Sequence, residues 1–170
     1  MNKLFFAAAL VCLFTLGAFA QKSADFSGKW NLDLTKSDLG QQAAMIKSQT
    51  VTITQSGTSF KVSTATERNT PPDGAAGGGQ GRGGMGGGGD QSYTLDGKEV
   101  STERQTPNGA VTIKTSAAQT GNKVVVTSVF PGPNGDMKST TTYELSGDGK
   151  TLTVTRESTR GSSKSVYTKG

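Results

Sequence analysis

Histidine is absent from this chain, and cysteine occurs once, as Cys12. Without an imidazole there is no Ser-His-Asp triad and no histidine metal ligand. A lone cysteine excludes an internal disulfide, and it falls in a segment that we expect to be removed. Histidine- and thiolate-dependent enzyme chemistry is therefore excluded. A hydrolase that works without histidine stays open as a third hypothesis, but we predict a non-enzymatic protein with no cofactor and no metal.

Acidic residues do not indicate a catalytic or metal site either. Asp136 and Asp148 lie in turns with too few neighbouring oxygen ligands to hold calcium. Four glutamates fall at positions of the predicted strands that alternate toward solvent: Glu99, Glu103, Glu144 and Glu157. Carboxylates in such positions keep a sheet soluble rather than forming a catalytic pair.

Basic residues outnumber acidic ones, giving a net charge of +5, but they are scattered along the chain. A nucleic-acid surface needs clustered charge, so we predict no nucleic-acid binding. Arg82 lies among glycines, yet a single Arg-Gly-Gly is not an RNA-binding array.

The first 20 residues have the pattern of a secretory signal peptide. Lys3 precedes the apolar run 4–17, and the small residues Ala18 and Ala20 lie two apart before the expected cleavage point. The run is shorter than the ~20 apolar residues that a transmembrane helix needs. We expect cleavage after Ala20, export to the periplasm or the extracellular space, and one mature domain of residues 21–170.

Cys12 offers an alternative fate, which is lipidation as in a bacterial lipoprotein. The residue before it, Val11, is not small, and apolar residues continue past it. We therefore favour cleavage at Ala20. The two outcomes differ in whether the mature protein partitions into detergent.

The mature chain reads as a series of short strands. Phe26, Trp30, Leu32 and Leu34 share one face at a period of two, and Trp30 is the only tryptophan. Further alternating segments with turn residues between them follow at 50–55, 60–66, 93–95, 100–104, 110–115, 123–130, 137–145, 151–157 and around 166–167. This spacing predicts an all-β fold, an antiparallel meander of about 8–10 strands closed into a barrel, because closure removes exposed strand edges.

Three segments depart from this pattern. Residues 35–48 predict a short helix capped by Ser37 that plugs one end of the sheet. The strand 123–130 is apolar on both faces, which suggests that both faces are covered. Residues 69–90 are dominated by glycine, which loses most entropy on ordering, and they predict a long disordered hairpin loop within the single domain.

Several motifs resemble the calycins, which are the lipocalin and fatty-acid-binding barrels, and in particular secreted bacterial lipocalin-like proteins. The opening Gly28-Lys29-Trp30 is similar to the Gly-x-Trp strand of that superfamily, and the segments 93–99 and 145–154 resemble repeats in the bacterial proteins. The resemblance implies that Arg156 stacks on Trp30 through a cation–π contact. In fatty-acid-binding proteins arginine and tyrosine near the C-terminus hold the ligand carboxylate. Here only Tyr167 matches, because Ser165 stands where the arginine would be.

Two functional hypotheses follow. The first is a secreted binding protein that holds a small hydrophobic or amphipathic ligand in its barrel. The second is an envelope scaffold with a filled barrel that acts through its surface and its Gly-rich loop. The candidate ligand-binding residues are Trp30, Tyr93, Tyr143, Arg156 and Tyr167. Trp30 is either the floor of a cavity or a core residue. Arg156 is a stacking, ligand-binding or solvent-facing group, and the three tyrosines either line a pocket or are ordinary sheet residues.

Overall fold

The computed structural model describes residues 23–69, 89–106, 109–132, 135–159 and 161–170. The predicted signal peptide and most of the predicted Gly-rich loop lie outside these ranges. Within the loop boundaries that we predicted, Gly89 and Asp90 belong to a strand, so the segment that follows the loop begins earlier than expected.

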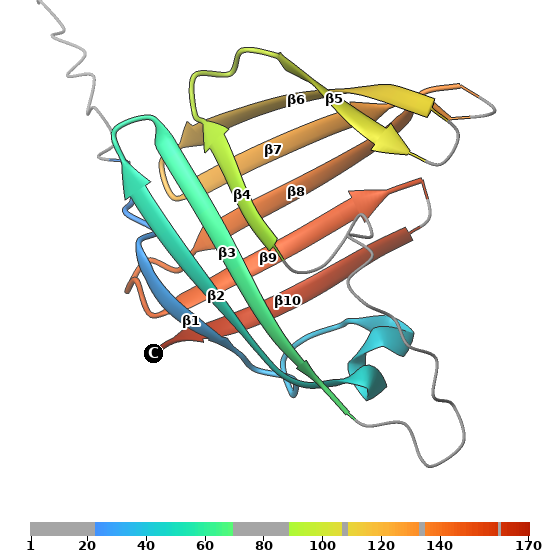
Figure 1. The fold of residues 1–170 in the computed structure, drawn as a ribbon. Coiled ribbons are helices and arrows are strands. Elements are labelled where there is room, and N and C mark those ends of the chain that lie inside the picture. The colour runs from blue at the N-terminus through green and yellow to red at the C-terminus, as the bar shows by residue number, and fades with distance from the viewer. Residues whose placement is uncertain (1–22, 70–88, 107–108, 133–134, 160) are drawn as a thin grey trace, which may run out of the picture.

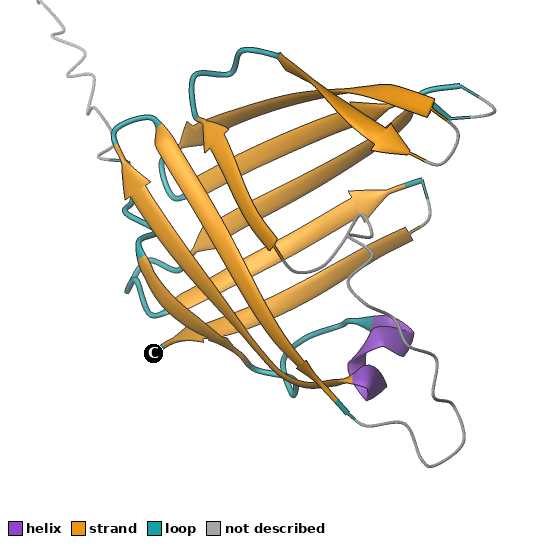
Figure 2. Ribbon diagram, in the orientation of Figure 1, coloured by secondary structure: helices purple, strands orange, loops and turns teal. Residues whose placement is uncertain are grey.

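Ten strands and one short 3-10 helix make up the described chain (Figures 1 and 2). In chain order they are β1 (Gly28–Leu32), η1 (Gly40–Met45), β2 (Ile46–Ser56), β3 (Ser59–Arg68), β4 (Gly89–Thr94), β5 (Val100–Thr106), β6 (Gly109–Thr120), β7 (Lys123–Phe130), β8 (Met137–Leu145), β9 (Thr151–Ser158) and β10 (Gly161–Lys169). The predicted all-β antiparallel meander with one short helix is confirmed.

The strands form one antiparallel sheet in the order β4-β3-β2-β1-β10-β9-β8-β7-β6-β5. The first and last strands of the chain pair with each other, and the sheet curls so that β1–β4 cross over β6–β9 (Figure 1). The two edge strands are β4 and β5, and the described residues contain no ladder between them. An isolated bridge from Asp96 to Ala118 links the β4–β5 connection to β6 instead.

One half of the barrel interior is filled with apolar side chains. The fully buried ones include Trp30, Phe26 and Phe60, and the Phe60 ring packs edge-on against Phe26 at 5.9 Å and against Tyr143 at 5.3 Å between centroids. Such edge-to-face pairs add to the stabilisation from burial alone. Aromatic side chains therefore occupy this half of the interior.

The segment before β1 seals that end through a hydrogen-bonded chain of amides. Gln55 accepts a hydrogen bond from the Phe26 backbone at 3.0 Å and donates one to the Gln119 side chain at 2.7 Å. Gln119 in turn donates to the Ala24 carbonyl at 2.7 Å. Paired in this way, the polar groups under the barrel floor avoid the cost of unsatisfied burial.

Side chains facing inward change from apolar to polar along the barrel. Four residues paired across β1, β10, β9 and β8 make an apolar row at the sealed end: Leu32, Tyr167, Leu152 and Leu145. Two rows further on, the paired residues are Ala117, Val126, Thr141, Arg156 and Ser163. The row after that contains Thr115, Ser128 and Ser139, which we call the hydroxyl row. Polarity therefore rises as far as the hydroxyl row, and the next row is apolar again, with Phe130 opposite Met137.

The predicted helix differs from the observed one. Helix η1 is a 3-10 helix that spans only Gly40–Met45, has no side-chain cap and buries none of its residues, so it is not a plug. Ser37 accepts a hydrogen bond from the Val166 backbone at 2.9 Å and donates one to the Asp33 carbonyl at 2.7 Å. This segment begins with Gly40 and contains few apolar side chains, so it has no apolar face that could pack against the sheet.

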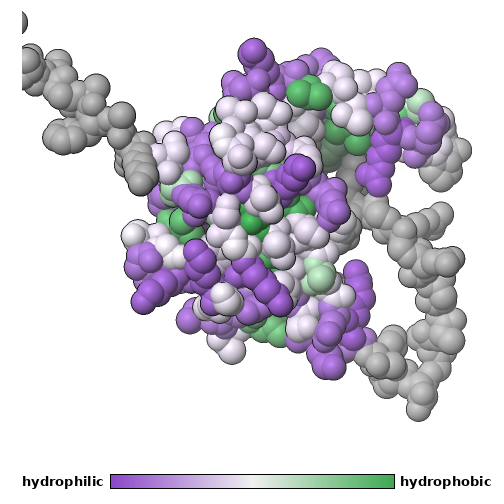
Figure 3. All heavy atoms as spheres, turned by 60° about the vertical axis from the view of Figure 1, so that its left-hand side comes forward, coloured by the Kyte–Doolittle hydropathy of each residue, from purple (hydrophilic) through white to green (hydrophobic). Residues whose placement is uncertain are grey.

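Two other expectations about burial were wrong. Strand β1 ends at Leu32, and Leu34 lies beyond it with 38% of its surface exposed. The outer face of β7 is open, since Val125 is also 38% exposed. The outer surface carries only scattered hydrophobic residues on the face shown in Figure 3. Isolated apolar residues of this kind are normal on a wetted sheet.

Candidate functional site

The unfilled half of the barrel holds a cavity of about 510 Å3 between the edge strands β4 and β5 and the strands β6 to β9. Its described lining is mostly polar: Gly89, Asp90, Gln91, Ser92, Tyr93, Thr94, Lys98, Val100, Thr102, Arg104, Ile113, Thr115, Ala117, Val126, Ser128, Phe130, Ser139, Thr141 and Arg156. A smaller hollow of about 70 Å3 shares Gly89, Gln91 and Arg156 with it and continues toward β10. The volume falls in the range of small-molecule sites.

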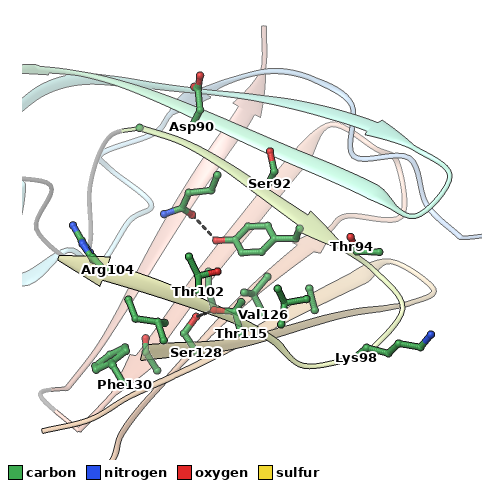
Figure 4. A pocket seen from close by; sticks show the side chains of 18 of the residues that line it. Asp90, Ser92, Thr94, Lys98, Thr102, Arg104, Thr115, Val126, Ser128 and Phe130 are labelled. Atoms are coloured by element: carbon green, nitrogen blue, oxygen red, sulfur yellow. Dashed lines mark hydrogen bonds between the residues drawn. The ribbon is translucent and has the colours of Figure 1, made fainter. Parts of the chain in front are cut away.

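Alternation along the strands decides which side chains reach the cavity. On β4, Gln91 and Tyr93 face inward, and the Tyr93 hydroxyl donates a hydrogen bond to the Gln91 side chain at 2.6 Å (Figure 4). Asp90 and Ser92 point away from the cavity in the same view, whereas Thr115 and Ser128 lie beneath it.

Arg156 lies where the cavity and the smaller hollow meet. It sits on β9 between Thr141 of β8 and Ser163 of β10, which are its direct partners in register. The charged residues of the described lining are Lys98, Arg104, Arg156 and Asp90, and the side chains of Lys98 and Asp90 are directed away from the cavity in Figure 4, which leaves the two arginines. The cavity therefore favours an anion on charge alone.

Three predicted tyrosines surround Arg156. Tyr93 lines the cavity, and Tyr143 and Tyr167 line the smaller hollow. Burial raises the pKa of each phenol, and the positive charge of Arg156 partly offsets that rise for all three. The pKa of Tyr143 is raised most, because Tyr143 is almost completely buried. All three are neutral hydrogen-bond donors at physiological pH.

The tyrosine hydroxyls differ in their partners. Tyr167 donates to the Gln49 side chain at 2.6 Å, and Gln49 donates to Thr66 at 2.8 Å. The Tyr143 hydroxyl makes no hydrogen bond with another described residue, and its ring packs on Phe60. Because no described side-chain polar atom is both sealed and unpartnered, this hydroxyl is open to the hollow. It can therefore donate to a ligand.

Trp30 lies apart from the other four predicted residues. It is fully buried in the filled half, where its indole nitrogen donates to the Phe26 carbonyl at 3.0 Å, and it lines neither hollow. The expected stacking of Arg156 on Trp30 is wrong, since the cation over the indole is Lys169, 5.3 Å from the ring centroid. Arg156 pairs with Ser163, six residues before Lys169 and therefore roughly 20 Å away along the strand.

Several site residues were not predicted from the sequence, namely Gln49, Gln91, Arg104, Thr141 and the hydroxyl row. The period-two alternation places Ser128 of β7 and Ser139 and Thr141 of β8 on the same faces as core residues, which is the signal that could have found these three. Among the described residues, no group of three or more acidic, cysteine or histidine side chains is placed to hold a metal ion. No helix in the described ranges is long and apolar enough to cross a membrane.

Solved structures with the same fold exist, although no family model and no curated protein sequence matches. A structure titled REP1-NXSQ fatty acid transporter is 19% identical, with a TM-score of 0.53 over 87% of this chain and 98% of that one. Secretory abundant heat soluble protein 4 from Ramazzottius varieornatus is 16% identical, with a TM-score of 0.54 over 89% and 99%. Lipid binding protein 8 of Caenorhabditis elegans is 14% identical, with a TM-score of 0.52 over 85% and 95%. At these identities the likeness shows the fold alone, an antiparallel β-barrel that this chain shares with the three structures.

Proposed function

We propose that this chain is an exported, non-enzymatic binding protein that holds a small amphipathic anion in its half-filled barrel. The observation that carries the proposal is Arg156 at the junction of a cavity of about 510 Å3 with the hollow beside it. The fold supports it, because two of the similar structures are titled as a fatty acid transporter and a lipid binding protein. Export is supported by the signal-peptide pattern of residues 1–20, and we expect the N-terminus of the mature protein to be Gln21.

The anionic group binds at Arg156, where the Tyr143 hydroxyl is free to donate a second hydrogen bond. Hydrogen bonds to a charged group are about twice as strong as neutral ones, and a positive charge in a partly closed cavity is poorly screened. The apolar part of the ligand lies against the apolar members of the lining: Val100, Ile113, Val126 and Phe130. An amphipathic anion satisfies both surfaces.

A fluorescence titration with 1-anilinonaphthalene sulfonate, an amphipathic anion, tests the proposal on the mature chain. We expect saturable binding that Arg156→Gln weakens roughly tenfold or more, as loss of a charge-assisted hydrogen bond does. Arg68→Gln is the matched control, because Arg68 is exposed at the end of β3 and lines neither hollow. Equal weakening by both variants would mean that the probe follows net charge and not the cavity.

The filled half of the barrel favours the second candidate, a scaffold that binds no ligand inside. The same titration separates the two, because a scaffold gives no saturable signal. Native mass spectrometry of protein purified from its own host adds an independent test. A copurifying small molecule of constant mass supports the binding protein, and bare protein in every preparation supports the scaffold.

A further inference from the structure

We infer that the ligand is a hydroxylated organic carboxylate rather than a plain fatty acid. The inference rests on the proposed function, since it concerns the occupant of the same cavity. It comes from the chemistry of the cavity wall and not from the charge of Arg156 alone.

The hydroxyl row crosses three neighbouring strands without a break. Thr115 of β6 is directly opposite Ser128 of β7, and Ser128 is directly opposite Ser139 of β8. Adjacent strands lie about 4.8 Å apart, so the row presents hydroxyls over roughly 10 Å of wall. Thr141 extends the polar wall one row toward the sealed end, beside Arg156. A ligand bound at Arg156 therefore lies along hydroxyl groups.

These hydroxyls have unused hydrogen-bonding capacity. Thr115 and Ser128 share one hydrogen bond of 3.2 Å, in which either can be the donor, while each hydroxyl offers one donor and two acceptor positions. Ser139 and Thr141 make no hydrogen bond with another described residue. No described polar side-chain atom is sealed without a partner, so these groups open onto the cavity, where they meet water or a ligand.

A saturated acyl chain placed along this wall removes that water and returns no hydrogen bond, which makes burial of the hydroxyls unfavourable. Hydroxyl groups on the ligand replace the lost bonds, and its apolar parts contact Val126 and Phe130, which flank Ser128 on the same face of β7. The wall therefore discriminates by the presence of ligand hydroxyls. Sites built to hydrogen-bond a ligand hydroxyl reject the analogue that lacks it more strongly than apolar pockets reject an extra methylene.

The acidic residue of the lining does not oppose this assignment. Asp90 pairs with Ser63 on β3 and points away from the cavity, as Figure 4 shows. The side chain of Arg104, on the edge strand β5, lies at the rim on the opposite side. The charged residue one inward row from Ser139 is therefore a cation, Arg156, which matches a carboxylate that carries hydroxyls.

The test compares two probes with the same chain and the same carboxylate, hexadecanoate and its trihydroxy derivative, by calorimetric titration of the mature chain. We expect the trihydroxy probe to bind roughly tenfold tighter or more, since two or three neutral hydrogen bonds are gained. The double variant Ser128→Ala with Ser139→Ala should abolish this preference by weakening the binding of the trihydroxy probe relative to that of hexadecanoate. Thr127→Ala with Thr140→Ala is the control, because this pair lies in register on the outer face of the same two strands.

Equal binding of the two probes, or tighter binding of hexadecanoate, overturns the inference and leaves the proposed binding function standing. A preference that survives the inner double variant also overturns it, because the hydroxyl row would not be its source. Binding of neither probe counts against the proposed function itself, and the inference falls with it.

Discussion

Truncation of Phe60 tests the division of the barrel into a filled and a hollow half. Phe60 is fully buried, and its ring contacts Phe26, Tyr93 and Tyr143 at centroid distances of 5.9, 6.5 and 5.3 Å. Phe→Ala in a close-packed core costs about 3–5 kcal/mol, and loss of edge-to-face partners keeps this site away from the lower end of that range. We expect about 4 kcal/mol for Phe60→Ala, or a fall in Tm of roughly 8–16 °C in a domain of this size.

Phe130→Ala is the matched variant in the hollow half. Phe130 is half-buried and lines the cavity, so its removal enlarges an existing space and strips fewer contacts. We expect a cost of about 1 kcal/mol. Urea titration followed by circular dichroism measures both, with thermal melts as a second measure. Phe60→Ala removes a large part of the free energy of unfolding of a typical domain, so this variant can fail to fold. In that case Phe60→Leu replaces it, with an expected cost of about 1.5 kcal/mol. Equal losses at the two positions would refute the division.

Three further predictions concern the sealed end, the indole and the phenols. Gln119→Ala should destabilise the protein by about 1–3 kcal/mol in urea titration, because the Gln55 amide and the Ala24 carbonyl lose their hydrogen-bond partner. The control Gln105→Ala, on the exposed edge strand β5, should leave the free energy of unfolding almost unchanged. Lys169→Gln should shift the fluorescence emission of Trp30 and lower the free energy of unfolding by about 0.5–1 kcal/mol. Arg156→Gln should leave that emission unchanged, and the reverse result would place Arg156 at the indole ring. Burial raises the pKa of Tyr93, Tyr143 and Tyr167, so the folded protein keeps phenolic protons that the unfolded chain releases near pH 10. The free energy of unfolding should therefore be independent of these three groups below pH 10 and should fall as the pH rises above 10. An ultraviolet titration of folded protein that showed all three phenols ionising together near pH 10 would contradict this prediction.

Strand positions and faces could be predicted from the sequence because period-two alternation depends on local residues only. The alternating segments 50–55 and 60–66 form the hairpin of β2 and β3, and in the segment 137–145 the alternation places Tyr143 and Leu145 on one face, which is the buried face of β8. Alternation in the segment 151–157 likewise places Leu152, Val154 and Arg156 on one face of β9.

Long-range partners could not be predicted in this way. The cation over Trp30 is set by the register between β1 and β10, and no local pattern distinguishes Lys169 from Arg156 for that position. The burial of β7 was overestimated because valines lie on both of its faces, so its sequence shows no polar face. In the described chain no other element covers its outer face. Ser37 resembles a helix cap in sequence, yet β10, far along the chain, supplies its partner.

The pairing of β1 with β10 has a consequence for how the chain reaches its native state. Strand β1 cannot complete its pairing until β10, the last strand, has been synthesised, so β1 to β4 exist long before the neighbour of β1 does. Contacts between such distant segments slow folding, and an unpaired strand edge invites association with other chains in the meantime. Removal of β10 (Gly161–Lys169) would leave β1 and β9 without their shared neighbour, and we expect a chain truncated before Gly161 to aggregate in place of forming a shorter barrel.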